Sequence, residues 1–127
     1  MAAKAKAKAK ASVRKLEEVL NFTEMGGSVR VFTDALGCKQ MELAIGFFKP
    51  GEGLKRHLHK TPSEEIYFVY KGKGTVYYGD QTVQVSAGTA LQIPPEVDHG
   101  VTNTGKEPLE IVFVTAPIQK QPMVITG

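Results

Sequence analysis

Short segments rich in β-branched and aromatic residues follow one another after Gly26-Gly27, and glycine, proline or aspartate separates each segment from the next. Such segments are typical of β-strands, and the separating residues are those that tight turns require. The pattern therefore predicts an all-β barrel or sandwich. The predicted strands are SVRVFTD (28–34), QMELAIGFFK (40–49), LKRHLH (54–59), EIYFVYKG (65–72), GTVYYGD (74–80), QTVQVS (81–86), ALQIPP (90–95), GVTNTG (100–105) and LEIVFVTAP (109–117).

The first residues of the chain differ in composition from the rest. Six of the 16 basic residues lie within residues 1–15, which contain no acid, so the remaining chain has 10 basic against 13 acidic residues. Alanine and lysine alternate in this segment, and a period of two leaves no apolar helical face to bury. We therefore expect residues 1–11 to be a disordered basic Ala/Lys tail, and residues 12–127 to form a single domain.

Composition also excludes several classes of partner. The mildly acidic domain has no basic stripe interleaved with aromatic residues, so we expect no nucleic-acid binding. No apolar stretch reaches the length of a signal peptide or a membrane span, so we expect no membrane partner. The sole cysteine, Cys38, cannot form an internal disulfide, which favours a reducing, cytoplasmic location and a structural role for this residue.

The three histidines of the chain, His57, His59 and His99, fall inside two short patterns, and the first pattern also contains Glu65. Imidazole and carboxylate groups are ligands for divalent first-row metals, so this concentration points to metal chemistry. The two patterns are GEGLKRHLHKTPSEEIYFVYKG (51–72) and GTALQIPPEVDHGVTN (88–103).

These patterns resemble the two sequence motifs of the cupin superfamily, G-x5-H-x-H-x(3,4)-E-x6-G and G-x5-P-x-G-x2-H-x3-N. Nine of the ten fixed positions match, so the chain is similar to the small single-domain, metal-binding cupins of the cupin 2 type. The resemblance implies a double-stranded β-helix, or jelly-roll cupin barrel, that assembles as a homodimer. It also implies one bound divalent transition metal (Fe, Mn, Ni or Zn), with His57, His59, Glu65 and His99 as ligands.

Strand geometry explains part of this spacing. Side chains at positions i and i+2 of a strand point to the same face, so His57 and His59 both face inward. If the strand that begins at Glu65 pairs back against the histidine strand through the loop KTPS, Glu65 comes opposite the histidines and Tyr67 lies on the same face. His99 belongs to the second pattern, so it can join this site only if the fold brings the two patterns together, as a barrel does.

Two departures from the motifs bear on the site. Glu96 stands where the family usually has glycine, which predicts a differently shaped turn and a carboxylate near the pocket mouth. The spacing from His59 fits Glu64, whereas the spacing back from Gly72 selects Glu65. We take Glu65 as the ligand because a strand fixes its register, while the preceding loop can absorb an extra residue.

The segment before the strands has two interpretations. Apolar residues recur at helical spacing in SVRKLEEVLNF (12–22), with Ser12 as a suitable N-cap, which predicts a short helix. In the cupins that the chain resembles, this segment often adds an edge strand or reaches a partner subunit instead, and VLNFTE (19–24) fits that role. The strand SVRVFTD would be an exposed edge, and edges of this kind are often covered by dimer formation.

Alternation along the strands suggests which residues surround the metal. Gln92 faces either inward, toward a substrate oxygen, or outward to solvent. Phe47, Met41 and Phe113 are candidate pocket residues, although such side chains mostly fill a barrel interior. Asn103 is expected to tie the chain after the second pattern by hydrogen bonds to the backbone.

The leading functional hypothesis is a mononuclear metal-dependent enzyme with a small oxygenated substrate. One class is a dioxygenase, in which the metal binds substrate and O2 together. The other class is an isomerase, lyase or cyclase, in which a base such as Tyr67, Glu64 or Glu96 moves a proton. The alternative is a non-catalytic metal- or small-ligand-binding module.

Overall fold

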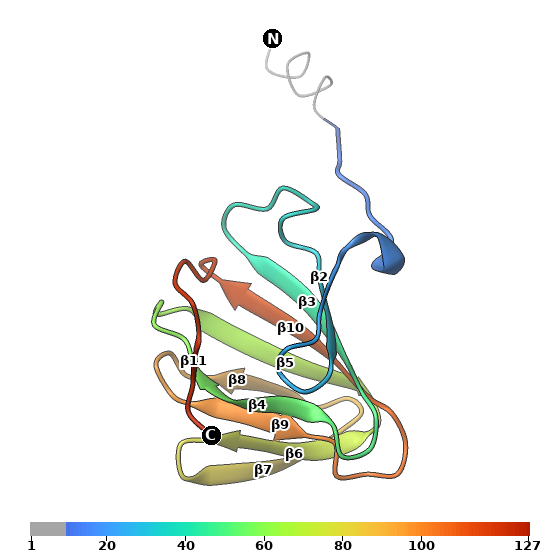
Figure 1. Cartoon of the computed structure of the whole chain (residues 1–127), viewed down its shortest axis with the longest axis vertical. Coiled ribbons are helices and arrows are strands. Elements are labelled where there is room, and N and C mark those ends of the chain that lie inside the picture. The colour runs from blue at the N-terminus through green and yellow to red at the C-terminus, as the bar shows by residue number, and fades with distance from the viewer. Residues whose placement is uncertain (1–9) are drawn as a thin grey trace.

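Two antiparallel β-sheets face each other in the computed structural model, which describes residues 10–127 (Figure 1). The six-stranded sheet has the order β1-β2-β3-β10-β5-β8, and the five-stranded sheet has the order β11-β4-β9-β6-β7. This is the predicted double-stranded β-helix. The elements are the 3-10 helix η1 (Leu16–Glu18) and strands β1 (Leu20–Phe22), β2 (Ser28–Val31), β3 (Glu42–Phe48), β4 (Gly53–Leu58), β5 (Glu64–Lys71), β6 (Lys73–Tyr78), β7 (Gln81–Ser86), β8 (Ala90–Ile93), β9 (His99–Thr102), β10 (Leu109–Ala116) and β11 (Val124–Ile125).

Strand alternation builds the core between the two sheets. In β10 every second residue, from Leu109 to Thr115, is buried, and the residues between them are partly exposed. In β5, Tyr67 and Val69 are fully buried, as the alternation predicted. Apolar side chains from both sheets thus meet in one interior, and this burial is the main force that holds the sheets together.

The N-terminal segment is an edge strand with one helical turn before it. The predicted helix over 12–22 is wrong except for η1, because residues 20–22 pair with β2 as a strand, and Leu20 remains 64% exposed. Instead β1 pairs with β2, which confirms the edge-strand alternative. Strand β2 is therefore covered on one side by β1 and on the other by β3, and the expectation that it is an exposed edge is wrong.

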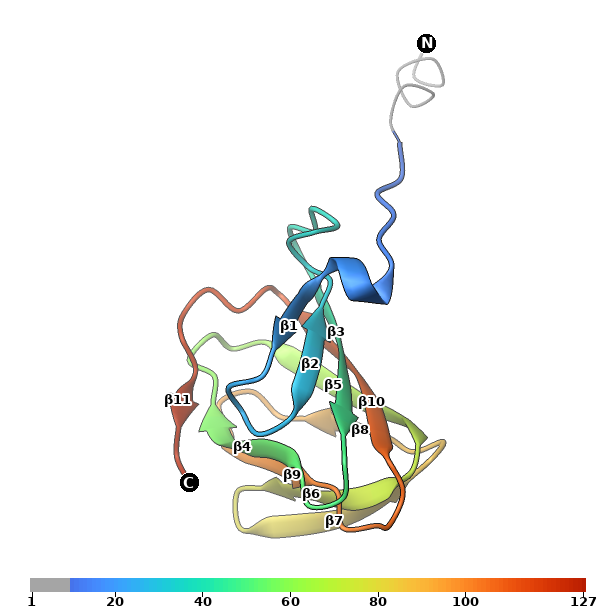
Figure 2. The same ribbon diagram turned by 45° about the vertical axis from the view of Figure 1, so that its right-hand side comes forward.

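The expected pairing between the histidine strand and the strand that begins at Glu65 is also wrong. Strand β4 pairs with β9 and β11, whereas β5 pairs with β10 and β8 in the other sheet. The chain between β4 and β5 therefore crosses from one sheet to the other, and Figure 2 shows the two strands on opposite sides of the interior. The chain also crosses between the sheets at Gly72, whereas β6 and β7 pair with each other as a hairpin through Gly79-Asp80.

The fixed glycines of the two patterns share a backbone conformation. Gly51, Gly72 and Gly88 have φ angles of 85°, 83° and 94°, in the left-handed region that side chains with a Cβ avoid. Glu96, which stands in a glycine position of the second pattern, has a φ of 63°. The turn thus keeps the left-handed backbone that glycine favours, instead of taking the different shape that the substitution suggested.

The described chain has two further features of note. The predicted tail over residues 1–11 lies outside the described residues except for Lys10 and Ala11, which are exposed. None of the helices within residues 10–127 is long and apolar enough to cross a membrane.

Candidate metal centre

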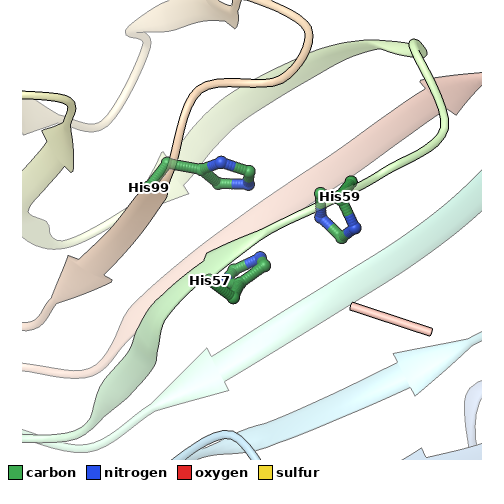
Figure 3. Close-up of side chains that lie close together, drawn as sticks. All are labelled: His57, His59 and His99. Carbon is green, nitrogen blue, oxygen red and sulfur yellow. The ribbon is translucent and has the colours of Figure 1, made fainter. Parts of the chain in front are cut away.

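Three histidine rings converge in the interior, close to one end of the five-stranded sheet. His57 lies in β4 and His99 begins β9, and the two residues are direct partners across the antiparallel pair. His59 follows β4 immediately, two residues after His57. Figure 3 shows the three rings directed toward one another, and one potential ligand atom from each lies within 4.8 Å of the others. The β4–β9 pairing thus brings the two sequence patterns together.

Glu65 approaches the histidines from the opposite sheet. Its Oε1 atom lies 3.0 Å from Nε2 of His99 and 4.0 Å from Nε2 of His59. Its Oε2 atom accepts a hydrogen bond of 3.3 Å from the hydroxyl of Thr115 on β10. Glu64, the other carboxylate that the motif spacing allowed, is exposed on the outer face of β5. The structure therefore brings Glu65, and not Glu64, to the three imidazoles.

Backbone carbonyls orient two of the rings. Nδ1 of His57 lies 2.7 Å from the carbonyl oxygen of Lys55, and Nδ1 of His99 lies 2.8 Å from that of Val97. A carbonyl oxygen only accepts, so each Nδ1 carries the proton, and the lone pair of the neutral ring is on Nε2, which faces the site. This arrangement is typical of metal-binding histidines, whose second nitrogen is held by a carbonyl or carboxylate.

Two buried atoms of the cluster have no hydrogen-bond partner among the described residues: Oε1 of Glu65 and Nε2 of His99. They are close to each other, but they do not align as donor and acceptor. A buried polar atom without a partner is costly, so native proteins seldom leave one without a ligand, ion or water. Three imidazole nitrogens and one carboxylate oxygen suit a divalent first-row transition metal, and such a metal would satisfy both atoms.

The electrostatics of the cluster favour the protonation state that binds metal. Burial, reinforced by the neighbouring His99, lowers the pKa of His57 to about 4. Burial also lowers the pKa of His59. Burial alone would raise the pKa of Glu65, but the contact with His99 and the other histidines outweighs it, so the pKa is lowered. Near neutral pH, His57 is therefore neutral and Glu65 is ionised, as metal coordination requires.

A pocket of about 170 Å³ opens beside the cluster. His57, His59 and Glu65 form part of its lining, and most of the remaining lining is apolar. This pocket is smaller than the roughly 300–1,000 Å³ typical of sites for drug-sized ligands, so it suits a small ligand about the size of a single ring. The apolar lining residues are Phe22, Met25, Val29, Val31, Leu54 and Phe113, together with Ala44 and Met123.

Tyr67 places a phenol in this pocket. Its side chain is fully buried, and its ring packs edge-on against Phe113, with 4.6 Å between the centroids. Its hydroxyl has no hydrogen-bond partner within the described chain. Burial, and to a smaller extent the charge of Glu65, raises the pKa of Tyr67 well above its ordinary value. The hydroxyl therefore keeps its proton, so Tyr67 is suited to donate rather than to act as the base suggested above.

Several residues predicted from sequence lie away from the pocket. Met41 and Phe47 are not among its lining residues, because their positions in and next to β3 point to the other face of the sheet. Gln92 is exposed and donates a 3.4 Å hydrogen bond to Glu64, so its outward orientation is the correct alternative. Glu64 is exposed and does not line this pocket. Glu96 is also exposed and absent from this lining, but it lines a smaller cavity beside Glu65 and His99. Of the predicted pocket residues, Phe113 alone lies there.

Sequence reasoning missed four polar residues of the pocket: Glu42, Thr115, Gln119 and Gln121. Alternation could have found Glu42, because it shares an inward face with Phe48, which is 1% exposed. The adjacent Phe47 and Phe48 left the choice of face open, since either could have been the buried one. Gln119 lies beyond β10 in a segment without regular structure, so no periodicity marks it.

Comparison with known proteins gives consistent results. Residues 45–115 match the family described as the Cupin domain. The chain is 35% identical over 81 residues to an uncharacterised protein of Methanocaldococcus jannaschii, an alignment that covers 64% of this chain and 63% of that protein. It is 27% identical over 109 residues to the polyketide synthase CurC of Streptomyces cyaneus, covering 84% and 70% of the two chains. The chain thus spans slightly less than two thirds of the archaeal relative.

A solved structure supports the fold. The polyketide cyclase RemF from Streptomyces resistomycificus superposes with a TM-score of 0.75 over 93% of this chain and 87% of that one. The two sequences are 17% identical, so this likeness concerns the fold alone.

Proposed function

Because the chain belongs to the cupin family, we propose that it is a metal-dependent enzyme that acts on a small oxygenated molecule. His57, His59, Glu65 and His99 would hold one divalent transition metal. The observation that carries this proposal is the pair of buried ligand atoms without hydrogen-bond partners, Oε1 of Glu65 and Nε2 of His99, beside an apolar pocket. A bound metal would polarise a substrate oxygen as a Lewis acid.

The residues around the pocket favour an isomerase, lyase or cyclase over a dioxygenase. Tyr67 lines the pocket and comes two residues after Glu65 on the same face of β5, and its buried hydroxyl has no hydrogen-bond partner in the described chain. In that position it can donate a hydrogen bond or a proton to a substrate oxygen that gains negative charge. The apolar lining excludes water from this step. The similarity to the polyketide synthase CurC also supports chemistry on an oxygenated carbon skeleton.

Metal analysis tests the proposal directly. The protein is purified under nitrogen next to the His57→Ala/His99→Ala double variant, and the metal content of both is measured by elemental analysis. We expect close to one divalent metal ion per wild-type chain and its loss in the variant. Circular dichroism of both proteins checks that the variant is folded, so that loss of metal reflects loss of ligands.

Exposure to air then separates the reaction classes. Metal that stays divalent in air, and that does not consume O2 when small enols or diketones are added, supports the isomerase, lyase or cyclase class. Iron that oxidises and consumes O2 with such a compound would assign the dioxygenase class instead. Absence of metal from the wild-type protein after growth in metal-supplemented medium would overturn the proposal.

A further inference from the structure

A row of polar side chains crosses the inner face of the six-stranded sheet. Glu65 on β5 is the direct partner of Thr115 on β10, and Thr115 is the direct partner of Glu42 on β3. Neighbouring partners in antiparallel strands are about 5 Å apart, so Glu42 lies roughly 10 Å from Glu65 along this row. Both carboxylates line the same pocket. The row therefore places a second carboxylate in the pocket, roughly 10 Å along the sheet from the proposed metal ligand Glu65.

Gln119 contacts Glu42, and it lines both this pocket and a smaller cavity beside Glu65 and His99. Its backbone N–H donates a hydrogen bond of 2.9 Å to Oε2 of Glu42, and its own side-chain Oε1 is buried without a partner among the described residues. The chain around it is held in place, because Lys120 N donates to the Thr61 hydroxyl and the Ser63 hydroxyl donates to the Pro117 carbonyl. Figure 1 shows this segment passing from β10 in one sheet to β11 beside β4 in the other.

The ionised carboxylate of Glu42 presents only acceptors to the pocket, whereas the side-chain amide of Gln119 carries one acceptor oxygen and two donors. Carboxylate oxygens and the amide Oε1 accept hydrogen bonds, and an acceptor buried without a partner requires a donor from a ligand or water. No lysine or arginine from residues 10–127 lines the pocket. Burial, together with the charges of Glu65 and Asp34, raises the pKa of Glu42 against the effect of its hydrogen bond from Gln119. A further negative charge is thus unfavourable at this end.

We propose that Glu42, held by the hydrogen bond from the Gln119 N–H, is a second polar anchor, which binds a hydroxyl or amino group at the end of the ligand away from Glu65. The ligand is then an uncharged, largely apolar molecule of about one ring, with oxygen atoms at the metal end and a hydrogen-bond donor at the other. Anionic ends such as a second carboxylate are rejected. This inference rests on the proposed metal site and adds the class of ligand that the site accepts.

Three catechols that differ at one substituent test the anchor, since the catechol oxygens serve the metal and the substituent reaches away from it. The probes are 4-(hydroxymethyl)catechol, 4-methylcatechol and 3,4-dihydroxybenzoate, and binding to the zinc-loaded protein is measured by calorimetry without oxygen. We expect the hydroxymethyl probe to bind about 3- to 10-fold more tightly than the methyl probe, as one net hydrogen bond provides. We expect the carboxylate probe to bind at least about 10-fold more weakly than the hydroxymethyl probe.

Glu42→Gln identifies the residue responsible. The amide still accepts a hydrogen bond from the Gln119 N–H, but it has no charge. In this variant, the affinity of the carboxylate probe relative to the hydroxymethyl probe should therefore rise by about 10-fold. The methyl probe should bind as it does to the wild type. Glu107→Gln removes one charge from an exposed loop and should leave the order of the probes unchanged. The thermal midpoint of each variant shows whether the fold is intact.

The outcomes separate this inference from the proposed function. Zinc-dependent binding of all three probes with equal affinity, or an order of affinities that Glu42→Gln leaves unchanged, would overturn the anchor but leave the metal site standing. Binding that is the same with and without zinc, and in the His57→Ala/His99→Ala variant, would contradict the proposed function itself. The expected order of affinities, changed by Glu42→Gln but not by Glu107→Gln, supports both the anchor and the proposed function.

Discussion

Tyr67 shows at the scale of one residue how function and stability compete. Its buried hydroxyl has no hydrogen-bond partner within residues 10–127, and such a group costs about 1–3 kcal/mol of stability. Tyr67→Phe keeps the ring packed on Phe113 and removes that cost, so we expect the free energy of unfolding to rise by about 1 kcal/mol. Urea denaturation of the metal-free proteins measures this change.

The same variant separates a functional hydroxyl from a structural one. We expect Tyr67→Phe to keep its bound metal and to lose about 100-fold or more in turnover once a substrate is known, as for loss of a proton donor. A fall in stability would show instead that the hydroxyl has a structural partner.

His57 makes the stability of the metal-free protein depend on pH. Its pKa falls from 6.5 to about 4 on folding, so the unfolded chain takes up a proton that the folded chain resists. Unfolding therefore becomes easier as pH falls from about 6.5 to about 4, by about 3 kcal/mol, and this effect levels off below pH 4. The lowered pKa values of His59 and Glu65 act in the same direction.

Chemical denaturation at a series of pH values, with a chelator present, measures this dependence. His57→Asn should flatten the curve between pH 6.5 and 4, because the titrating ring is gone. A variant whose curve matches the wild type would show that His57 is not the group responsible.

At the scale of elements, the turn between β8 and β9 contains a residue in an unfavourable conformation. Glu96 has a φ of 63°, in the region that costs a residue with a Cβ roughly 1–2 kcal/mol relative to glycine. Its side chain is exposed. We expect Glu96→Gly to raise the free energy of unfolding by about 1 kcal/mol, measured as a higher thermal midpoint, and to leave His99 in place.

Glu96→Ala is the matched control for this turn, because alanine removes the carboxylate but keeps the Cβ. It should leave the thermal midpoint close to that of the wild type. Equal stabilisation by alanine and glycine would assign the effect to the charge and not to the backbone.

At the scale of the whole molecule, the outer face of the six-stranded sheet is the best candidate for a subunit interface. Ile66 and Phe68 on β5 are 47% and 41% exposed. Across the sheet, Val114 and then Leu43 lie beside Ile66, and Val112 and then Ile45 lie beside Phe68. These residues form a continuous outer apolar patch, and patches of this kind on soluble proteins commonly mark contact sites.

We propose that this outer apolar patch pairs with its copy in a homodimer. Light scattering after size-exclusion chromatography should give a dimer for the wild type and a monomer for Phe68→Glu, because the buried charge would oppose association. Thr82→Glu, on an exposed position of β7, should remain a dimer. A wild-type monomer at micromolar concentration would contradict the proposal.

Local pattern predicted much of this molecule. The strands after Gly26-Gly27 and the burial of Tyr67 follow from alternation with a period of two, which is a property of neighbouring residues. The hydrogen bonds of Asn103 to the backbone of Phe48 and Glu107 were also expected from the second pattern. The helix over 12–22 failed because tertiary pairing with β2 outweighed a weak helical periodicity.

Residue type and local alternation were enough to name the candidate metal ligands and to put His57 and His59 on one face. The fold alone places β4 and β5 in different sheets, so that Glu65 meets the histidines across the interior. It also decided that Glu42 and Gln119 reach the same pocket, whereas Gln92 and Phe47 do not. These outcomes depend on which distant strands pair, and that choice is set by the burial of the whole core, which no local pattern contains.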